Sequence, residues 1–386
     1  MAFDGQFSGE MPAQSAPRWS LRDRWLDLRN RLLVDARFQR WAVRFPLTRL
    51  IARRRARQLF DIAAGFVYSQ VLLGCVQLRL FEALAAGPRR VADLAEHAGL
   101  SPAGMRRLLL AAETLRLVER RGEQGYGLGE LGAAVLGNPG IGAMVSHHTH
   151  LYADLADPVA LLRGREDTLL SRYWAYASAD RPDELDGAQV SEYSDLMAAS
   201  QAFIAGDILD AYSLRGHKSL LDLGGGDGAF AAAAADRWPH LRVALFDLPA
   251  VAERANARFA RLGLAKRVCA IGGDLFDPLL PSGHDLISLV RVVHDHDDER
   301  VIRILRAAHA ALRPGGVLLI AEPMAGTHGA EPVGEAYFGL YLMAMGSGRP
   351  RTRAELGLLL RQVGFRRVRE AKTLQPLLVR VVVATA

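Results

Sequence analysis

A glycine-rich turn between two apolar runs constrains this chain more than any other feature. Residues 219–247 read SLLDLGGGDGAFAAAAADRWPHLRVALFD, and four of the five residues from Gly224 to Gly228 are glycine. An alanine-rich helical segment follows, and then a second apolar run that ends at Asp247. This order predicts a strand, a tight turn, a helix and a second strand, the opening βαβ unit of a nucleotide-type α/β fold.

Two acidic residues indicate what this turn binds. Glycine lets the backbone turn sharply and approach a ligand with no Cβ in the way. Asp247 ends the second strand, where a carboxylate can accept both hydroxyls of a ribose. Asp222 stands two residues before Gly224 and suits a cationic ligand better than a pyrophosphate. The pattern resembles the first motif of class I S-adenosylmethionine-dependent methyltransferases; the alternative is a turn that only packs strand against helix.

Length and composition indicate a protein of more than one domain. A chain of 386 residues with 50% apolar and 23% charged residues fits two globular domains with a large core. Cys75 and Cys269 show no spacing for metal or redox work and fit a reducing compartment. We expect no transmembrane helix and no signal peptide, because no apolar run is long enough, and therefore a cytoplasmic location.

Residues 18–57 concentrate positive charge. They hold thirteen arginines and three aspartates, a net charge of +10 against +6 for the whole chain. Trp19, Leu21, Trp25, Leu28 and Leu32 recur near helical spacing among these arginines, and Pro46 interrupts the run. One interpretation is a helical extension with a solvated basic face. The other is an interfacial helix that associates peripherally with anionic lipid, such as the inner membrane.

Residues 59–137 predict a helical domain that ends in a small β-wing. Residues 60–87 are apolar all round, so we expect them to be buried in the domain or against a second subunit. Ser101 and Pro102 are start signals for a helix. The predicted elements are a helix over 90–98, a helix from Ser101 to about Leu117 and a wing over 118–128.

This winged-helix pattern binds DNA in many proteins, so a transcription regulator is an alternative to an enzyme. The helix that would read bases offers only Arg106 and Arg107 together. It lacks the spread of Asn, Gln, Ser and Arg side chains that base reading requires. We therefore expect a dimerisation module and no nucleic-acid partner.

Residues 138–212 predict a helical linker that lines a substrate pocket. His147, His148 and His150 form a cluster that invites a metal interpretation, but no acidic or thiol ligand stands at a helpful spacing. Pocket lining and ordinary packing remain the alternatives, and we predict no metal. Tyr193, Met197 and Ser200 share one face of a helix predicted over 190–212.

The later strands add polar residues to one edge of the predicted sheet. Strands are expected at 268–271, 285–293 and 317–321. The residues that follow the five strands are Gly224, Asp247, Asp274, His294 and Glu322. Ligands of open α/β sheets bind at this carboxyl edge. Asp274 suits an adenine amino group, with Leu275 and Phe276 over the ring; an aspartate turn or helix cap is the alternative.

A set of motifs over residues 60–386 resembles the O-methyltransferases of the caffeate and acetylserotonin type. The motifs are LLDLGGGDG, LFDLP, GGDLF, VVHDHDDE, RPGGVLLIAEP and PRTRAELGLLLRQVGF. The resemblance implies an α/β, Rossmann-like class I methyltransferase domain (213–386) after a linker (138–212), a winged-helix dimerisation domain (59–137) and a basic extension (1–58). The arginine-tryptophan segment and FPLTRLIARRRARQLFDIAAGFVYSQVLL resemble bacterial carotenoid 1-hydroxy O-methyltransferases of the demethylspheroidene and hydroxyneurosporene type.

The resemblance also implies residue roles. The cofactor would be S-adenosylmethionine, the assembly a homodimer and the acceptor the tertiary 1-hydroxyl of an acyclic carotenoid, with a phenolic or polyketide hydroxyl as the alternative. The expected cofactor-binding residues are Asp222, Gly224, Gly226, Asp247, Leu248, Asp274, Leu275, Arg291 and Ser200. His294 would be the general base, oriented by Glu322 and Glu355; the alternative is a strand-end histidine that only hydrogen-bonds Asp295. The expected hydrophobic acceptor pocket comprises Tyr193, Met197, Phe338, Tyr341 and Met345, with core packing as the alternative.

This chain departs from the plant members of the family in two places near the base. His296 stands where they have tryptophan, two residues after the base. Arg291, three residues before the base, stands near where they have lysine four residues before it. The role of Arg291 is therefore less firmly implied than that of His294.

Overall fold

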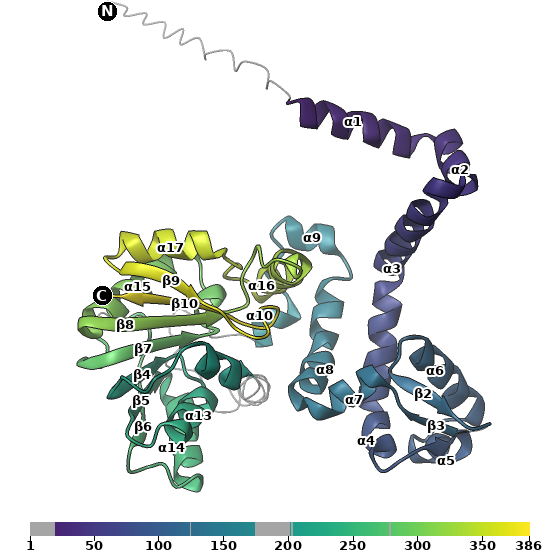
Figure 1. The fold of residues 1–386 in the computed structure, drawn as a ribbon. Helices are drawn as coiled ribbons and strands as arrows, with labels where there is room; N and C mark the ends of the chain where they lie inside the picture. Colours follow the sequence, from purple (N-terminus) through teal and green to yellow (C-terminus); the bar gives the residue numbers. More distant parts are fainter. Residues whose placement is uncertain (1–19, 124, 174–200, 202–203, 278) are drawn as a thin grey trace, which may run out of the picture. The chain divides into compact units, whose positions relative to one another are not determined.

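The computed structural model describes residues 20–123, 125–173, 201, 204–277 and 279–386 (Figure 1). The chain divides between Gln70 and Val71 into two compact units, and each is described by itself. The predicted domain boundary at residue 58 falls inside a continuous helix. Tyr193, Met197 and Ser200 lie outside the described residues.

The N-terminal unit consists of helices whose ends follow local capping rules. They are α1 (Leu21–Val34), α2 (Ala36–Arg44) and the first part of α3 (Pro46–Gln77). Ser20 and Asp23 form a capping box at the start of α1, and Asp35 accepts from two backbone N–H groups at the start of α2. The chain breaks at Pro46, as predicted, because proline favours the first turn of a new helix.

Helix α3 is longer and more exposed than the sequence suggested. Among the described helices it alone is long and apolar enough to cross a membrane, with an 18-residue window of mean hydropathy 1.7 that is 11% buried. Length and composition do not show that α3 spans a membrane, so the expectation of no transmembrane helix stays a prediction. Burial begins only near its end, at Leu73 and Cys75, whereas Ile62 and Phe66 are exposed in the single chain.

The predicted winged helix is present. After α4 (Leu80–Ala85) come α5 (Val91–His97), α6 (Pro102–Thr114) and α7 (Glu130–Gly137). Strands β1 (Arg89–Arg90), β2 (Val118–Arg121) and β3 (Gly125–Leu128) pair antiparallel in the order β1-β3-β2. Ser101 caps α6 by accepting from the Gly104 N–H at 3.1 Å. The module closes over a core that includes Leu94, Met105 and Leu109.

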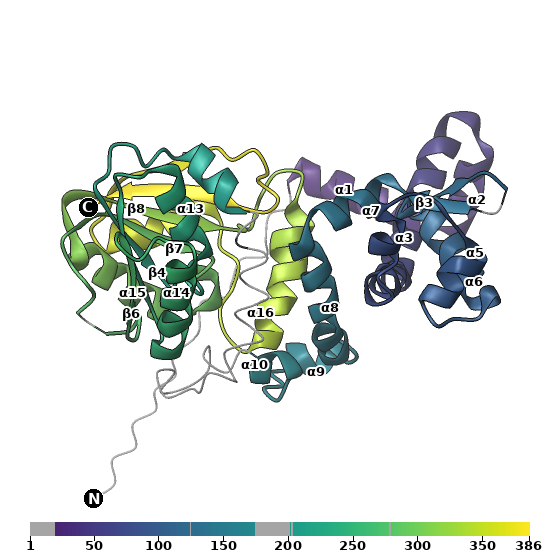
Figure 2. The same cartoon turned by 90° about the horizontal axis from the view of Figure 1, so that it is seen from below.

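A helical layer joins this module to the sheet. It contains α8 (Pro139–Asp154), α9 (Pro158–Leu162), α10 (Leu169–Tyr173), the π-helix η3 (Pro332–Phe338) and α16 (Gly339–Met345). Helices α8 and α16 lie side by side (Figures 1 and 2). Buried Asp154 accepts from the N–H groups of Leu169 and Leu170 at 2.8 and 2.9 Å, so α10 is fixed against the end of α8.

The C-terminal part contains a seven-stranded sheet in the order β6-β5-β4-β7-β8-β10-β9. The strands are β4 (Ser219–Leu223), β5 (Arg242–Asp247), β6 (Val268–Gly272), β7 (His284–Val290), β8 (Leu312–Glu322), β9 (Arg366–Ala371) and β10 (Arg380–Thr385). Only β10 runs antiparallel to its neighbours. Strand order reverses on either side of β4, and such a switch point opens a crevice at the carboxyl ends.

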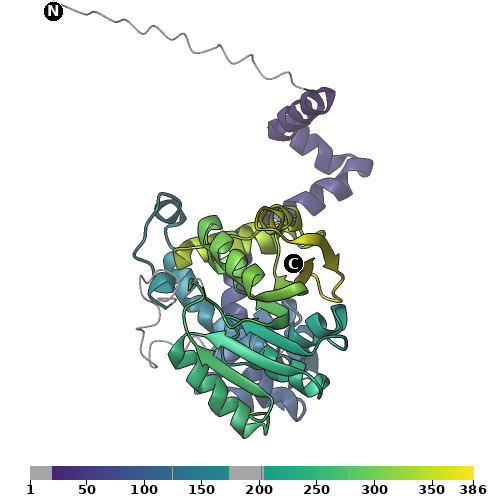
Figure 3. The same cartoon turned by 90° about the vertical axis from the view of Figure 1, so that its left-hand side faces the viewer.

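Helices cover both faces of this sheet (Figures 1 and 3). One face packs on α13 (Ala229–Arg237) and α14 (Pro249–Arg261), through Phe230 and Phe259. The other packs on α15 (Asp298–Ala311) and α17 (Arg353–Gln362), through Ile304 and Leu356. The strands are apolar on both sides for this reason. The predicted α/β class is confirmed.

The segment from Arg313 to Gly316 lies inside β8, although the sequence analysis expected that strand only over 317–321. Strand β8 already begins at Leu312, opposite His284, and pairing resumes between Val317 and Leu286. The intervening residues therefore form a bulge. Gly315 has a φ of 75°, a conformation that glycine adopts without strain.

Candidate active site

The glycine turn follows β4 and combines packing with an open surface. Gly224 has a φ of 64° and its N–H donates to the Phe246 carbonyl at 2.8 Å. A Cβ on Gly228 would lie 2.4 Å from Phe259 Cζ, so this glycine lets α14 approach. At Gly226, the nearest atom to such a Cβ would be 3.9 Å away, on Gln201. Gly228 therefore fits the packing interpretation of the turn, whereas Gly226 leaves the open space that the ligand interpretation requires.

Asp247 ties the end of β5 to this turn. Its Oδ2 accepts from the Gly226 N–H at 2.8 Å and its Oδ1 from the Leu248 N–H at 2.7 Å. Burial raises the pKa of Asp247 to about 6, against the effect of these two bonds. Each carboxylate oxygen has a second lone pair, so the group can still accept from two hydroxyls.

Asp222 lies beneath the turn and not in the pocket wall, which corrects its expected direct contact with a cofactor. It is fully buried, and its Oδ1 accepts from the Ser288 hydroxyl at 2.6 Å. Its Oδ2 would be 2.6 Å from a Cβ on Gly225, so the carboxylate supports the turn from below. Burial raises the pKa of Asp222 to about 7.

The loop after β6 supplies an acid and an apolar pair. Asp274 Oδ1 accepts from the Phe276 N–H at 2.9 Å, so the predicted alternative of an aspartate turn is present. Asp274 and Leu275 nevertheless line the same pocket as Asp247. The turn therefore fixes the carboxylate at the pocket wall.

These residues surround a pocket of about 720 Å³ that is partly open to solvent. Six predicted residues line it: Gly224, Asp247, Leu248, Asp274, Leu275 and Arg291. Phe276, expected over the adenine ring, lines it too. Gln201, Asp295 and His296 also line it, although the sequence analysis assigned none of these three to the binding site. Three carboxylates and one guanidinium in this wall leave it acidic, which suits a ligand with a cationic centre.

Arg291 and His296 border the pocket on the side of β7. Arg291 has a φ of 57°, unusual for a side chain with a Cβ, and its N–H donates to the Ala321 carbonyl at 2.8 Å. The His296 ring meets Phe276 edge-on, with ring centroids 5.3 Å apart. Burial lowers the pKa of His296 to about 4, so this imidazole is neutral at pH 7.

His294 is buried between two carboxylates. Its Nε2 lies 3.0 Å from Asp295 Oδ1 and its Nδ1 lies 3.7 Å from Glu322 Oε1. The same Glu322 oxygen accepts from the His294 backbone N–H at 3.0 Å. Burial opposes the charged imidazole, but the charges of Asp295 and Glu322 outweigh it and raise the pKa of His294. Glu322 faces Nδ1 without a hydrogen bond to it, and the contact with Asp295 corresponds to the alternative interpretation of His294.

Glu355 does not orient His294, which corrects the second implied carboxylate. It is the N3 residue of a capping box with Thr352, whose N–H and hydroxyl both donate to Glu355 Oε2 at 2.8 Å. Its other oxygen accepts from Arg349 at 2.8 Å. The pattern Thr352-x-x-Glu355 is itself a sequence signature of a helix start, and it could have indicated this role.

The loop before α17 holds the base segment in place. The Arg349 N–H donates to the His294 carbonyl at 2.9 Å. Fully buried Arg351 donates to the carbonyls of Val293 and His296 at 2.8 and 2.7 Å, and it pairs with Asp298 at 2.7 Å. These bonds fix the turn of chain that carries His294.

The predicted acceptor residues separate into different environments. Phe338 packs on His294, with ring centroids 5.9 Å apart, so it lies beside the expected base. Tyr341 bonds His147 through its hydroxyl, at 2.8 Å. Met345 is fully buried in the core of the helical layer, which corresponds to the packing alternative. The structure thus brings one of these three described side chains to His294.

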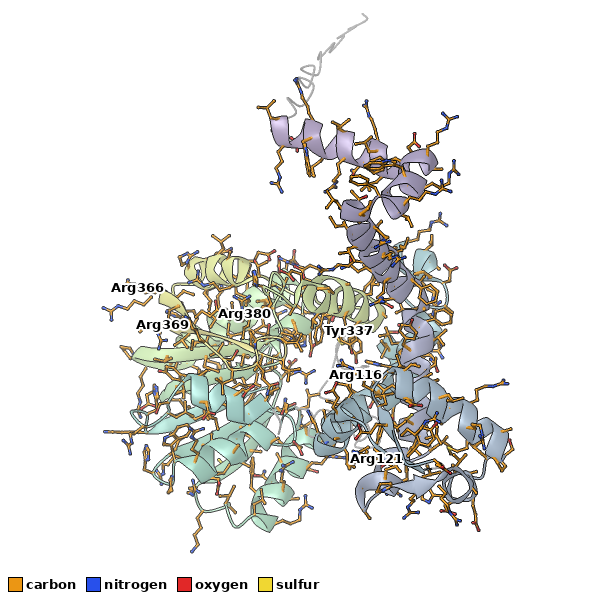
Figure 4. The ribbon with its side chains drawn as sticks, turned by 45° about the vertical axis from the view of Figure 1, so that its right-hand side comes forward. Arg116, Arg121, Tyr337, Arg366, Arg369 and Arg380 are labelled. Atoms are coloured by element: carbon orange, nitrogen blue, oxygen red, sulfur yellow. The ribbon has the colours of Figure 1, made fainter. Side chains whose placement is uncertain are left out.

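Tyr337, which the sequence analysis missed, belongs to the same cluster (Figure 4). Its hydroxyl lies 2.7 Å from His148 Nε2, and its ring meets Phe338 at 5.0 Å. Burial raises the pKa of Tyr337 to about 12, and the Arg291 charge partly opposes this. Within the described residues no group of three or more His, Cys, Asp or Glu side chains is arranged to hold a metal ion. His147 and His148 of α8 bond Tyr341 and Tyr337.

Comparison with known proteins supplies the family. A model described as an O-methyltransferase domain matches residues 152–366, and one described as an O-methyltransferase dimerisation domain matches residues 60–138. Demethylspheroidene O-methyltransferase of Cereibacter sphaeroides is 44% identical over 348 residues, 90% of this chain and 91% of that protein. Acetylserotonin O-methyltransferase of Mus musculus is 35% identical over 341 residues, 82% of this chain and 85% of that protein.

The solved structure of human N-acetylserotonin methyltransferase in complex with SAM superposes with a TM-score of 0.70 at 26% identity. The match covers 86% of this chain and 97% of that one. The chain belongs to the S-adenosylmethionine-dependent O-methyltransferases. An O-methyltransferase of this family has a class I α/β domain and an N-terminal dimerisation domain, and both are present here.

The pocket of this O-methyltransferase fits its cofactor, S-adenosylmethionine. Asp247 stands at the strand end with acceptor capacity for ribose hydroxyls, and Leu275 and Phe276 offer apolar surface for an adenine. The acidic wall favours the sulfonium charge.

The wing of the O-methyltransferase does not present free positive charge. Arg116 pairs with Glu130, Arg120 with Glu113 and Arg121 with Glu119. Figure 4 labels Arg116 and Arg121. Paired arginines contribute little attraction for a phosphate backbone, so the regulator alternative gains no support from these contacts.

Proposed function

We propose that this O-methyltransferase methylates the tertiary 1-hydroxyl of an acyclic carotenoid of the demethylspheroidene or hydroxyneurosporene type. The observation that carries the proposal is the 44% identity to a demethylspheroidene O-methyltransferase over 90% of this chain. The aromatic side of the site supports it, because Phe338 places an apolar ring beside His294. O-methylation of a phenolic or polyketide hydroxyl is the second candidate, and the relationship to acetylserotonin O-methyltransferase favours it.

We assign a different part of S-adenosylmethionine to each group of residues in the pocket. In the proposal, Asp247 accepts from the ribose hydroxyls, and Asp274 and Leu275 hold the adenine. Gly224, Gly226 and Leu248 supply backbone close to the ligand, and Asp222 supports them from below. Arg291 borders the cofactor pocket next to Tyr337. Bound S-adenosylmethionine supplies an electrophilic methyl group, so the protein chiefly has to supply proximity and a base.

His294 acts as the general base in the proposed mechanism. In this structure Nε2 donates to Asp295. For catalysis Asp295 must leave Nε2 and the neutral imidazole must carry its proton on Nδ1, facing Glu322, so that Nε2 can take the proton of the acceptor hydroxyl. Glu322 faces Nδ1, where it fixes the ring orientation and stabilises the imidazolium that forms. An alcohol is a very weak acid, so proton removal is late and coupled to C–O bond formation.

The variant His294→Ala tests this role. S-adenosylmethionine binding, measured by calorimetry, should persist because His294 is not in the pocket wall. Turnover should fall on the order of 10²–10⁴-fold, the usual contribution of a positioned base. Turnover close to that of the wild type would remove His294 from the mechanism.

The acceptor is tested by competition between chemical classes. We expect the full-length protein to transfer label from methyl-labelled S-adenosylmethionine to demethylspheroidene dispersed in detergent. A simple phenol and N-acetylserotonin serve as matched acceptors in the same detergent. Label in the phenol but not in the carotenoid would favour the second candidate.

The proposal includes two features of the assembly. The matched dimerisation domain favours a homodimer that involves the exposed apolar surface of α3 from residue 60 onward. Residues 18–57 precede that match, and their basic, apolar character favours peripheral contact with the inner membrane, where a carotenoid would be dissolved.

A further inference from the structure

Helix α1 carries a narrow apolar stripe that faces water. Leu21, Trp25, Leu28 and Leu32 are all exposed, and Trp25 keeps 60% of its surface accessible. At about 100° per residue, these four side chains fall within about 60° of one another around the helix. No residue of α1 is buried in the structure. A stripe of this kind on a solvent-facing helix marks a surface for association.

Charges are arranged around this stripe in a definite order. Arg22 and Arg29 project on one side of it, and Arg24 and Arg31 project on the other. The acidic and amide side chains of α1, which are Asp23, Asp27 and Asn30, occupy the opposite face. A helix lying in a bilayer interface needs this order, because arginines beside the stripe reach the phosphates while their stems stay in apolar surroundings.

Helix α2 repeats the arrangement with aromatic side chains. Phe38, Trp41 and Phe45 form a continuous stack, with ring centroids 5.6 and 5.0 Å apart. Arg37, Arg40 and Arg44 recur at the same helical spacing on an adjoining face. Rings with adjacent cations suit the boundary between headgroups and acyl chains, where aromatic side chains are enriched.

We propose that α1 and α2 dock on the surface of an anionic lipid bilayer, with Trp25 and Leu28 at the centre of the inserted stripe. Residues 20–57 hold twelve arginines and three aspartates, a net charge of +9, which complements anionic headgroups. A bilayer has a charged headgroup layer above an apolar layer. A helix lying parallel to its surface can place flanking arginines in the first layer and an apolar stripe in the second. These residues precede the dimerisation match that begins at residue 60, so that match gives them no protein partner.

Co-flotation of the full-length protein with vesicles tests the docking. Vesicles of phosphatidylglycerol and phosphatidylcholine are compared with vesicles of phosphatidylcholine alone. The double variant Trp25→Ser, Leu28→Ser interrupts the stripe. Its matched control is Val34→Ser, because Val34 is 81% exposed on the same helix but lies away from the stripe. A third variant, Arg22→Gln with Arg29→Gln, removes two flanking charges.

The docking predicts binding to the anionic vesicles with strong salt dependence. Partitioning should fall at least about tenfold in the stripe variant and remain unchanged in Val34→Ser. It should fall about fivefold for each arginine removed. Equal flotation by all variants would overturn the proposal. So would the absence of flotation combined with loss of the dimer in the stripe variant, because a second copy of the chain would then cover the stripe.

The docking rests on the proposed function, because it concerns access to a membrane-dissolved carotenoid, but it is measured separately, by flotation. Methylation of detergent-dispersed demethylspheroidene is measured in the same stripe variant. Normal turnover in detergent with lost flotation supports the docking and leaves the carotenoid proposal intact. Flotation without carotenoid methylation by the wild type would defeat the acceptor and not the docking.

Discussion

At the scale of single residues, the pair of His294 and Asp295 sets the expected pH dependence. In the proposed mechanism His294 acts when neutral. Burial opposes its charged form, but Asp295 and Glu322 raise its pKa above the ordinary histidine value of about 6.5. Activity should therefore rise with pH through a value above that. Asp295→Asn removes one negative charge, so the pKa should fall and the acid limb of kcat should move to lower pH. An unmoved limb would show that another group titrates.

Variants of Glu322 and Glu355 should differ in their effects on turnover and on stability, since only Glu322 faces His294. Glu322→Gln should lower turnover with the cofactor still bound. Glu355→Ala should lower the free energy of unfolding by about 0.5–2 kcal/mol through loss of the capping box, with little change in kcat. Thermal melts and steady-state rates on both variants check this. A large loss of kcat in Glu355→Ala but not in Glu322→Gln would show that Glu355 does act at the active site.

At the scale of elements, the π-helix η3 carries Tyr337 and Phe338 to the base. Helices of this type are rare and concentrate at functional sites. Tyr337→Phe removes the partner of His148, and Tyr341→Phe removes that of His147, one turn further along. Each should cost about 1–3 kcal/mol of stability. We expect only Tyr337→Phe also to lower kcat, because Phe338 packs on His294. Equal rates in both variants would contradict this.

Elements that depend on residues close together in the sequence could be predicted, and features that depend on contacts between distant residues could not. The turn from Gly224 to Gly228 and the strand ending at Asp247 were predictable, because the sequence carries glycines and apolar runs at fixed spacing. The position of Glu355 was predictable only in part. The pattern Thr352-x-x-Glu355 signals a capping box, but no periodicity reports the contact of Glu355 with Arg349. The bulge at Gly315 depends likewise on pairing with β7.

At the scale of the whole molecule, the exposed side of α3 predicts the oligomeric state. Ile62 and Phe66 lie one turn apart within the dimerisation match and face solvent in the single chain. Their joint replacement by aspartate should raise the dimer dissociation constant on the order of 100-fold, measured by sedimentation. Leu374→Asp, an equally exposed leucine outside that match, is the control. A dimer of unchanged strength in the α3 variant would place the interface elsewhere.

The bond between His294 and Asp295 has a consequence for selectivity. In the proposed mechanism His294 accepts a proton at Nε2, which is bonded to Asp295 in this structure, so an acceptor alcohol must first displace that carboxylate. A large apolar acceptor can offset this displacement through burial of its own surface, whereas water and small alcohols cannot. The proposal therefore predicts that this bond slows methyl transfer to small hydroxyl compounds.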